Sequence, residues 1–320
     1  MTRPFTKKYS AALITLFLIQ AIGYGAPFRV VGYLPYGPDL VARAAAIDLT
    51  RLTVLNIAFL NPDPAGEIPP DDGLGQVTEL AHTKGVKVLI SIGGGDPPAV
   101  LKELLKRKAG QEFLVATLTA VCDRYNIDGI DVDLEGPLVD THYESFVARL
   151  AAALRTRNKL LTAAIATVYA SDYTDKTLSF YDFVNLMSYD KTGPWDKSRP
   201  GPHAPYSMAV DDLNYWTTTR RLPAQKINLG LPFYGYGFGP GAPESISFHD
   251  LAEKYPSDLD HDQITLEPNS IIYYNGTTTI SAKVSLALQK AGGIMIWQLL
   301  QDADPPHSLL HKIDSLIKIK

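Results

Sequence analysis

The sequence predicts an α/β fold, a closed (β/α)8 barrel of the TIM type. Eight short apolar runs with strand character occur along the 320 residues, and helical stretches separate most of them. This alternation favours a closed barrel over an open doubly wound sheet, which is the alternative. The predicted strands are 29–34, 53–59, 87–92, 129–135, 161–167, 183–189, 227–233 and 293–298.

Helices and two long loops account for the intervals between these strands. The clearest helical patterns are 74–84, 99–124, 143–158, 210–220, 282–291 and 308–319. Residues 191–206 are rich in Pro and Gly, and residues 235–270 contain four alternating glycines before a polar stretch with a short helix at 249–254. We predict two long loops here, at the carboxyl ends of strands, where barrel enzymes place their active sites. The second is too short for a sizeable insertion domain, so we predict one domain.

The first 26 residues have the pattern of a signal peptide. Arg3, Lys7 and Lys8 precede an apolar stretch at 11–22, and small residues follow before position 27. The apolar stretch is shorter than the ~20 residues that a membrane-spanning helix needs. We therefore predict a protein that is secreted or periplasmic after cleavage, with residues 27–320 as the barrel domain.

Composition narrows the partners of the chain. Its formal net charge is −4 without a basic cluster, which argues against nucleic acid and is compatible with a neutral polymer. Cys122 is the only cysteine, so no intrachain disulfide can form and no lipid anchor follows the leader. We expect a monomer without a membrane anchor, in which Cys122 is a buried, unreactive thiol.

The run Asp-Gly-Ile-Asp-Val-Asp-Leu-Glu-Gly at 128–136 is the most informative segment. Asp131, Asp133 and Glu135 alternate with aliphatic residues and therefore share one face of a strand. Parallel strands are buried on both faces, and three neighbouring buried acids cannot all be ionised. Protons must then be shared, which is how a carboxylic acid stays protonated for use as a general acid near neutral pH.

A barrel makes the roles of these acids more specific. Inward-pointing side chains come from alternate positions, so all three acids would point inward, with Glu135 nearest the rim. Glu135 is our candidate general acid. Asp131 lies deeper and could share a proton with Asp133, whereas Asp128 precedes the strand and more naturally fixes the turn.

The run also resembles the Asp-x-x-Asp-x-Asp-x-Glu signature of family 18 glycoside hydrolases, the chitinase-like enzymes. The resemblance implies substrate assistance: the acetamido oxygen of an N-acetylglucosamine unit attacks its own anomeric carbon, and water opens the resulting oxazolinium with retention. Asp133 would hold the acetamido N–H. Glu135 would act first as acid and then as base.

Three further segments are similar to this family. Met187-Ser188-Tyr189-Asp190 resembles its Met-x-Tyr-Asp segment, which implies that the Tyr189 hydroxyl contacts the acetamido oxygen and that Met187 and Asp190 line the same subsite. Trp297 resembles the Trp that floors the sugar-binding subsite, and an indole offers a flat apolar plate to a pyranose. Ser91-Ile92-Gly93-Gly94 matches a Ser-x-Gly-Gly segment, for which we expect an architectural role. Leu134 and Gly136 depart from the family pattern, and Gly136 puts details of the subsite in doubt.

Aromatic residues stand at the ends of four other predicted strands. Tyr33, Phe59, Tyr169 and Tyr234 would suit either a sugar-lined mouth or a buried layer, and the sequence leaves both open. Trp195, Tyr206 and Trp216 are candidates for more distant sugars, although Trp216 fits a helix core better. No histidines have metal-ligand spacing with a third partner, so we expect no metal and no cofactor.

The sequence leaves three functions to compare. The first is a secreted, endo-acting chitinase that cleaves β-1,4 links between N-acetylglucosamine units of chitin or related oligosaccharides, in an open, shallow cleft. The second is an endo-β-N-acetylglucosaminidase that trims N-glycans with the same acids. The third is a carbohydrate-binding, lectin-like barrel with weak or no catalysis. The segment at 187–190 and Trp297 favour the first, and the presence of Glu135 argues against the third.

Overall fold

The structure, a computed structural model, describes residues 27–267 and 269–318. The predicted signal peptide at 1–26 lies outside the described residues. Within them, no helix is both long and apolar enough to cross a membrane.

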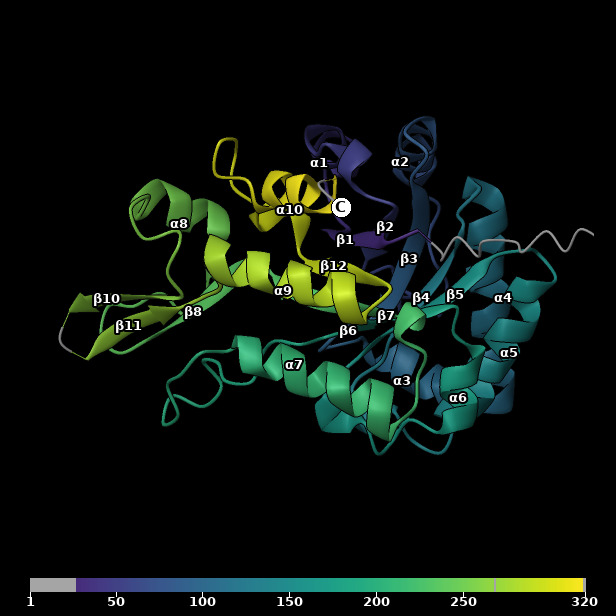
Figure 1. The fold of residues 1–320 in the computed structure, drawn as a ribbon. Coiled ribbons are helices and arrows are strands. Elements are labelled where there is room, and N and C mark those ends of the chain that lie inside the picture. Colours follow the sequence, from purple (N-terminus) through teal and green to yellow (C-terminus); the bar gives the residue numbers. More distant parts are fainter. Residues whose placement is uncertain (1–26, 268, 319–320) are drawn as a thin grey trace, which may run out of the picture.

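Eight parallel strands close into a barrel, which confirms the predicted fold class (Figure 1). Neighbouring strands pair in register around the ring, and β3, β4 and β5 place Ser91, Asp131 and Thr162 side by side. The strands, in the order of the ring, are β1 (Arg29–Pro35), β12 (Gly293–Trp297), β7 (Ile227–Pro232), β6 (Phe183–Leu186), β5 (Leu160–Ile165), β4 (Gly129–Asp133), β3 (Lys87–Gly93) and β2 (Val54–Ala58).

Helices surround this barrel. The predicted helix at 99–124 is two helices, because Arg107 is extended and the chain turns between them. Gly110 allows the second to pack on the first, since a Cβ there would lie 2.3 Å from the Leu104 carbonyl oxygen. The helices are α1 (Leu40–Ala46), α2 (Asp72–Thr83), α3 (Ala99–Leu105), α4 (Lys108–Tyr125), α5 (Tyr143–Arg155), α6 (Asp175–Phe180), α7 (Tyr206–Asn214), α8 (Phe248–Lys254), α9 (Thr277–Lys290) and α10 (Leu309–Lys318).

The segment 235–270 contributes to a small antiparallel sheet, so the prediction of a long loop was wrong, whereas the short helix predicted at 249–254 is present. The strands of this sheet are β8 (Tyr234–Phe238), β9 (Ile246–Ser247), β10 (Gln263–Glu267) and β11 (Ser270–Tyr273), and they extend to the left of the barrel in Figure 1, with α8 above them. Gly235 and Gly237 lie within β8, where a Cβ would come within 2.4 and 2.3 Å of backbone oxygens. These glycines therefore permit close backbone approach instead of marking a loop. The unit remains small, as expected.

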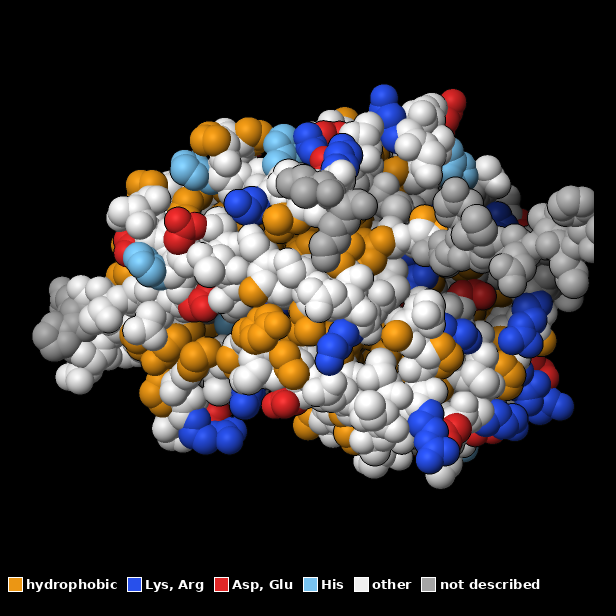
Figure 2. Space-filling model, in the orientation of Figure 1, with side chains coloured by type: hydrophobic (Ala, Val, Ile, Leu, Met, Phe, Trp, Pro, Cys, Tyr) orange, Lys and Arg blue, Asp and Glu red, His pale blue; other side chains and the backbone are white. Residues whose placement is uncertain are grey.

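The two faces of each barrel strand bury different chemistry. Ile130, Val132 and Leu134 are fully buried in the core between strands and helices. Asp131 and Asp133 point into the barrel, as the alternation predicted. On the outer surface, Figure 2 shows basic and acidic side chains interspersed with neutral and apolar ones.

Candidate active site

A cavity of about 230 Å³ opens at the carboxyl ends of the barrel strands. Eight of its lining residues were predicted from the sequence as site residues, and Gly95 and Ala164 complete it. Asp131 lies outside the lining, beneath Asp133, and Tyr234 contacts the cavity through Asp190. The lining residues are Tyr33, Phe59, Gly95, Asp133, Glu135, Ala164, Met187, Tyr189, Asp190 and Trp297.

Asp131 is a fully buried acceptor in the barrel interior. Its Oδ2 accepts hydrogen bonds from Tyr33 Oη at 2.7 Å and Ser91 Oγ at 2.8 Å. Its Oδ1 accepts from Thr162 Oγ1 and, at 3.3 Å, from Asn185 Nδ2. Burial raises the pKa of Asp131, while these hydrogen bonds lower it and so favour the ionised form.

Asp133 has the opposite surroundings. It is 3 % exposed, and its Oδ1 has no hydrogen-bond partner among the described residues. Burial raises the pKa of Asp133 well above its usual range, and the charges of Glu135 and then Asp131 raise it further. A proton shared by the buried pair therefore resides more readily on Asp133 than on Asp131.

Glu135 lies at the rim, two residues beyond the end of β4. Its backbone remains extended, so it still points to the same face as Asp131 and Asp133. Burial raises the pKa of Glu135, and the neighbouring charge of Asp190 raises it further. A Cβ at position 95 would lie 3.8 Å from Glu135 Oε1. Because Gly95 has no side chain, the Glu135 carboxyl remains accessible from the cavity. Glu135 is thus the least buried of the three acids, and it combines a raised pKa with access to a ligand.

The segment after β6 forms the opposite wall. The strand β6 ends at Leu186 instead of the predicted residue 189. Beyond it the backbone leaves the sheet and turns at Asp190, which has a left-handed conformation with φ 61°. Asp190 accepts a 2.6 Å hydrogen bond from Tyr234 Oη. Tyr189 is buried, and its hydroxyl is 3.7 Å from Met295 Sδ. That hydroxyl donates to the sulfur, which is a weak acceptor, so its oxygen is free to accept and its proton can turn to a stronger acceptor in the cavity.

His203 belongs to this wall but was missed as a site residue. Its ring is fully buried, with Nδ1 3.4 Å from Asp190 Oδ1 and Nε2 3.2 Å from the Tyr234 carbonyl oxygen. It comes from the 191–206 loop, and no local pattern distinguishes it from the other histidines. Nδ1 has no hydrogen-bond partner among the described residues, so the ring approaches Asp190 without a hydrogen bond to it.

Three aromatic side chains form the remaining surface. The Trp297 ring centroid is 5.4 Å from that of Tyr33 and 5.7 Å from that of Phe59. Gly94, with φ +87°, leaves room for Phe59, since a Cβ there would lie 2.6 Å from that ring. The Ser-x-Gly-Gly segment therefore shapes the cavity, as an architectural role requires.

The structure separates the other candidates from this cavity. Asp128 accepts from the Val88 amide at 2.8 Å and contacts His82 at 2.7 Å, which fixes the turn before β4. Trp216 is fully buried, whereas Trp195 is 61 % exposed and packs edge-on against Tyr236.

A second cavity, of about 390 Å³, shares Met187, Tyr189 and Asp190 with the first. It continues past Val168 and Met208 and so extends the groove beyond Met187 and Asp190. Within the two described stretches, no group of three or more His, Cys, Asp or Glu side chains is arranged to hold a metal ion.

Comparisons with known proteins agree with this architecture. Residues 29–302 match the family described as Glycosyl hydrolases family 18. The GH18 chitinase ChiB from the chitin utilization locus of Flavobacterium johnsoniae is 34% identical, with a TM-score of 0.83, over 91% of this chain and 94% of that one. A chitinase from Bacteroides thetaiotaomicron is 28% identical, with a TM-score of 0.78, over 91% and 97%.

Two curated relatives match at lower identity. A chitinase-like effector of Moniliophthora roreri is 27% identical over 71% of this chain and 63% of its own length. Chitinase A1 of Niallia circulans is 23% identical over 86% and 56%. The chain thus spans less than two thirds of these relatives. The family match nevertheless covers most of the sequence, and the chain belongs to family 18 of the glycosyl hydrolases.

Proposed function

We propose that the protein is an endo-acting chitinase that hydrolyses β-1,4 bonds between N-acetylglucosamine units with retention. The observation that carries this proposal is the position of Glu135: a carboxyl with a raised pKa reaches the cavity directly above the Asp133–Asp131 pair. A general acid must be protonated and accessible: the raised pKa of Glu135 favours its protonated form, and its side chain lines the cavity. Chitinases among the similar proteins support the choice of substrate.

The proposed reaction follows from these positions. Glu135 protonates the glycosidic oxygen as the bond to the anomeric carbon breaks, and the acetamido oxygen of the same sugar attacks that carbon. Asp133 accepts the acetamido N–H, and Tyr189 donates to the acetamido oxygen. Water then opens the oxazolinium ion, with Glu135 taking the proton of the water. No second nucleophilic carboxylate is needed.

The shape of the two connected cavities supports endo cleavage. Trp297, with Tyr33 and Phe59 beside it, offers an apolar floor to a pyranose ring. The second cavity continues from Met187 and Asp190, so sugar units could be bound on both sides of the scissile bond. Export through residues 1–26 and a monomeric state complete the proposal.

A comparison of wild type with Glu135→Gln tests this function. Both are incubated with chitin oligomers and with a high-mannose glycoprotein, and Glu79→Gln, a surface change on α2, serves as the matched control. We expect hydrolysis of the chitin oligomers, and a loss of 10²–10⁴-fold in rate for Glu135→Gln alone. Equal rates for wild type and Glu135→Gln would refute the assignment.

The substrate pair separates the other candidates. Cleavage of the glycoprotein but not of chitin oligomers would identify the endo-β-N-acetylglucosaminidase activity. Sugar binding by both proteins with cleavage by neither would identify a lectin-like barrel.

A further inference from the structure

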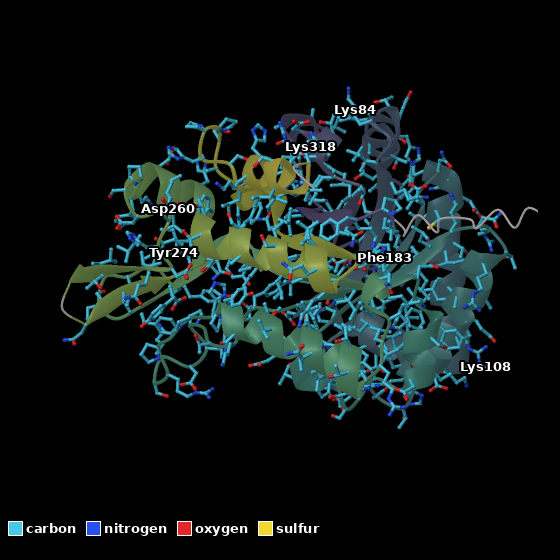
Figure 3. The ribbon with its side chains drawn as sticks, in the orientation of Figure 1. Lys84, Lys108, Phe183, Asp260, Tyr274 and Lys318 are labelled. Carbon is cyan, nitrogen blue, oxygen red and sulfur yellow. The ribbon has the colours of Figure 1, made fainter. Side chains whose placement is uncertain are left out.

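A chain of hydrogen bonds runs through the barrel from its amino-terminal end to Asp131. It begins at Arg29, the first residue of β1, whose Nε donates to Asn228 Oδ1 at 2.9 Å. The same guanidinium donates to the Gln225 carbonyl and lies 4.8 Å from the centroid of Phe183. Figure 3 labels Phe183 near the carboxyl end of α9. Arg29 and Phe183 are the first residues of β1 and β6, so they lie at the end of the barrel opposite the cavity. Arg29 is therefore held in place far from the proposed chemistry.

The direction of this chain is fixed by Arg29. A guanidinium can only donate, so the atom of Asn228 that faces it must be the amide oxygen. Asn228 then has its Nδ2 free to donate, and it donates to Asn185 Oδ1 at 2.9 Å. This in turn leaves Asn185 Nδ2 pointing onward, 3.0 Å from Tyr33 Oη and 3.3 Å from Asp131 Oδ1. One cation thus determines the orientation of two buried amides.

This chain of hydrogen bonds ends at the carboxylate oxygens of Asp131. Asn185 contacts Tyr33, whose hydroxyl donates to Asp131 Oδ2. Ser91 and Thr162 supply the other donors from β3 and β5. Of the titratable groups, Tyr33 on β1 and Asp133 on β4 face Asp131. The hydroxyls of Tyr143 and Tyr181 lie farther out and are neutral, because burial raises their pKa well above its usual range. A reversed Asn185 amide would direct its oxygen at the carboxylate and favour protonation of Asp131.

We propose that Arg29, Asn228 and Asn185 form a positioning chain that keeps Asp131 ionised and so reserves the shared proton for Asp133. The catalytic consequence rests on the proposed function, since Asp133 lies next to the general acid. The active form of the Asp131–Asp133 pair then carries one proton, and entry of a second proton ends activity. By favouring the ionised form of Asp131, the positioning chain of Arg29, Asn228 and Asn185 ensures that the pair binds its second proton only at low pH.

The pH dependence of kcat/KM on a chitin oligomer tests the chain. Arg29→Met and Asn228→Leu each release Asn185, and we expect the acidic limb to move up by about one pH unit, the worth of one hydrogen bond to a charged group. Arg29→Lys keeps a charged donor and should restore most of the wild-type position. Asn56→Leu is the matched control, because Asn56 is a fully buried amide on β2 with no hydrogen-bond partner among the described residues. An unchanged limb in Arg29→Met, or an equal shift in Asn56→Leu, overturns the proposal.

Thermal unfolding gives a second readout that does not need activity. In Arg29→Met the ionised form of Asp131 loses support, so the loss of Tm should be largest above the pKa of Asp131 and should shrink as Asp131 becomes protonated. We expect a smaller Tm difference from wild type at pH 4 than at pH 8, and a constant difference for Asn56→Leu. A pH-independent loss in Arg29→Met overturns the chain. An inactive wild type that shows the expected pH-dependent loss would refute the proposed function alone.

Discussion

Lys283 on α9 offers a quantitative test of how the wall around the site is built. Its side chain is fully buried, and Nζ donates to the Ala204 carbonyl and to Asn275 Oδ1, both at 2.8 Å. Burial lowers the pKa of Lys283 from 10.5 to about 7, against the opposing charges of Asp262 and Asp212. A neutral amine still donates hydrogen bonds, so these contacts persist when the proton is lost.

The magnitude follows from this change in pKa. Each unit corresponds to ~1.4 kcal/mol, so the folded state binds this proton roughly 5 kcal/mol more weakly than the unfolded chain. Below about pH 7 both states carry the proton, and the full cost is present. Between about pH 7 and pH 10.5 only the unfolded chain carries it, so the free energy of unfolding rises by ~1.4 kcal/mol per pH unit from this group.

Urea unfolding of wild type and Lys283→Met at pH 6, 7, 8 and 9 measures this contribution, with the fluorescence of buried Trp216 as the signal. The variant lacks the rise, so its stability relative to wild type should fall by ~3 kcal/mol between pH 7 and pH 9. Lys290→Met, an exposed change at the end of the same helix, should leave the pH dependence unaltered. Parallel stability curves for wild type and Lys283→Met would refute the reasoning.

This lysine matters to the site because of the residue that it holds. Ala204 follows His203, whose ring lies against Asp190 and Tyr234. Asp190 in turn raises the pKa of Glu135. Lys283 therefore supports, from outside the barrel, the wall that tunes the proposed general acid.

Two further predictions concern that wall and the aromatic floor. Asp190→Asn keeps the acceptor for Tyr234 but removes a negative charge that raises the pKa of Glu135, so the basic limb of the kcat/KM profile should move to lower pH. The control Asp211→Asn, in the neighbouring cavity, should leave this limb in place. An unmoved limb in Asp190→Asn would contradict the prediction. Gly94→Ala should displace Phe59 and raise KM about five-fold, equal to ~1 kcal/mol of lost contact, as measured by initial rates on chitin oligomers. Gly85→Ala is the control, because Gly85 has φ +73° but open space around it, so this change should cause only the backbone strain of ~1–3 kcal/mol. An equal rise of KM in Gly85→Ala would show that displacement of Phe59 is not the cause of the effect in Gly94→Ala.

The strand pattern predicted most of the fold because it is local. Alternation of acids with Ile130, Val132 and Leu134 requires a strand with one aliphatic face, and the barrel buries that face under helices. The same pattern located Asp131, Asp133 and Glu135 correctly in space. Strand ends were less predictable: β6 stops at Leu186, yet Met187–Asp190 continue along the cavity wall after leaving the sheet.

What the sequence did not indicate depends on contacts between distant segments. Lys283 bonds to a carbonyl 79 residues away, and a lysine within a helical pattern is normally expected in solvent. His203 gains its surroundings from β8, which itself was predicted as part of a loop. The glycines in β8 looked like turn residues because the backbone that approaches them comes from elsewhere in the chain.

The charges around the three acids explain why they cannot all be ionised at once. Among the described residues that line the first cavity there is no Lys, Arg or His, so no cation there neutralises Asp133 or Glu135. Asp131 is supported by neutral donors, and Arg29 contributes only through the two amides. A nearby cation would allow all three acids to ionise and would remove the proton donor. The proposed proton donor thus depends on the lack of a cationic side chain in the cavity lining as well as on the acids themselves.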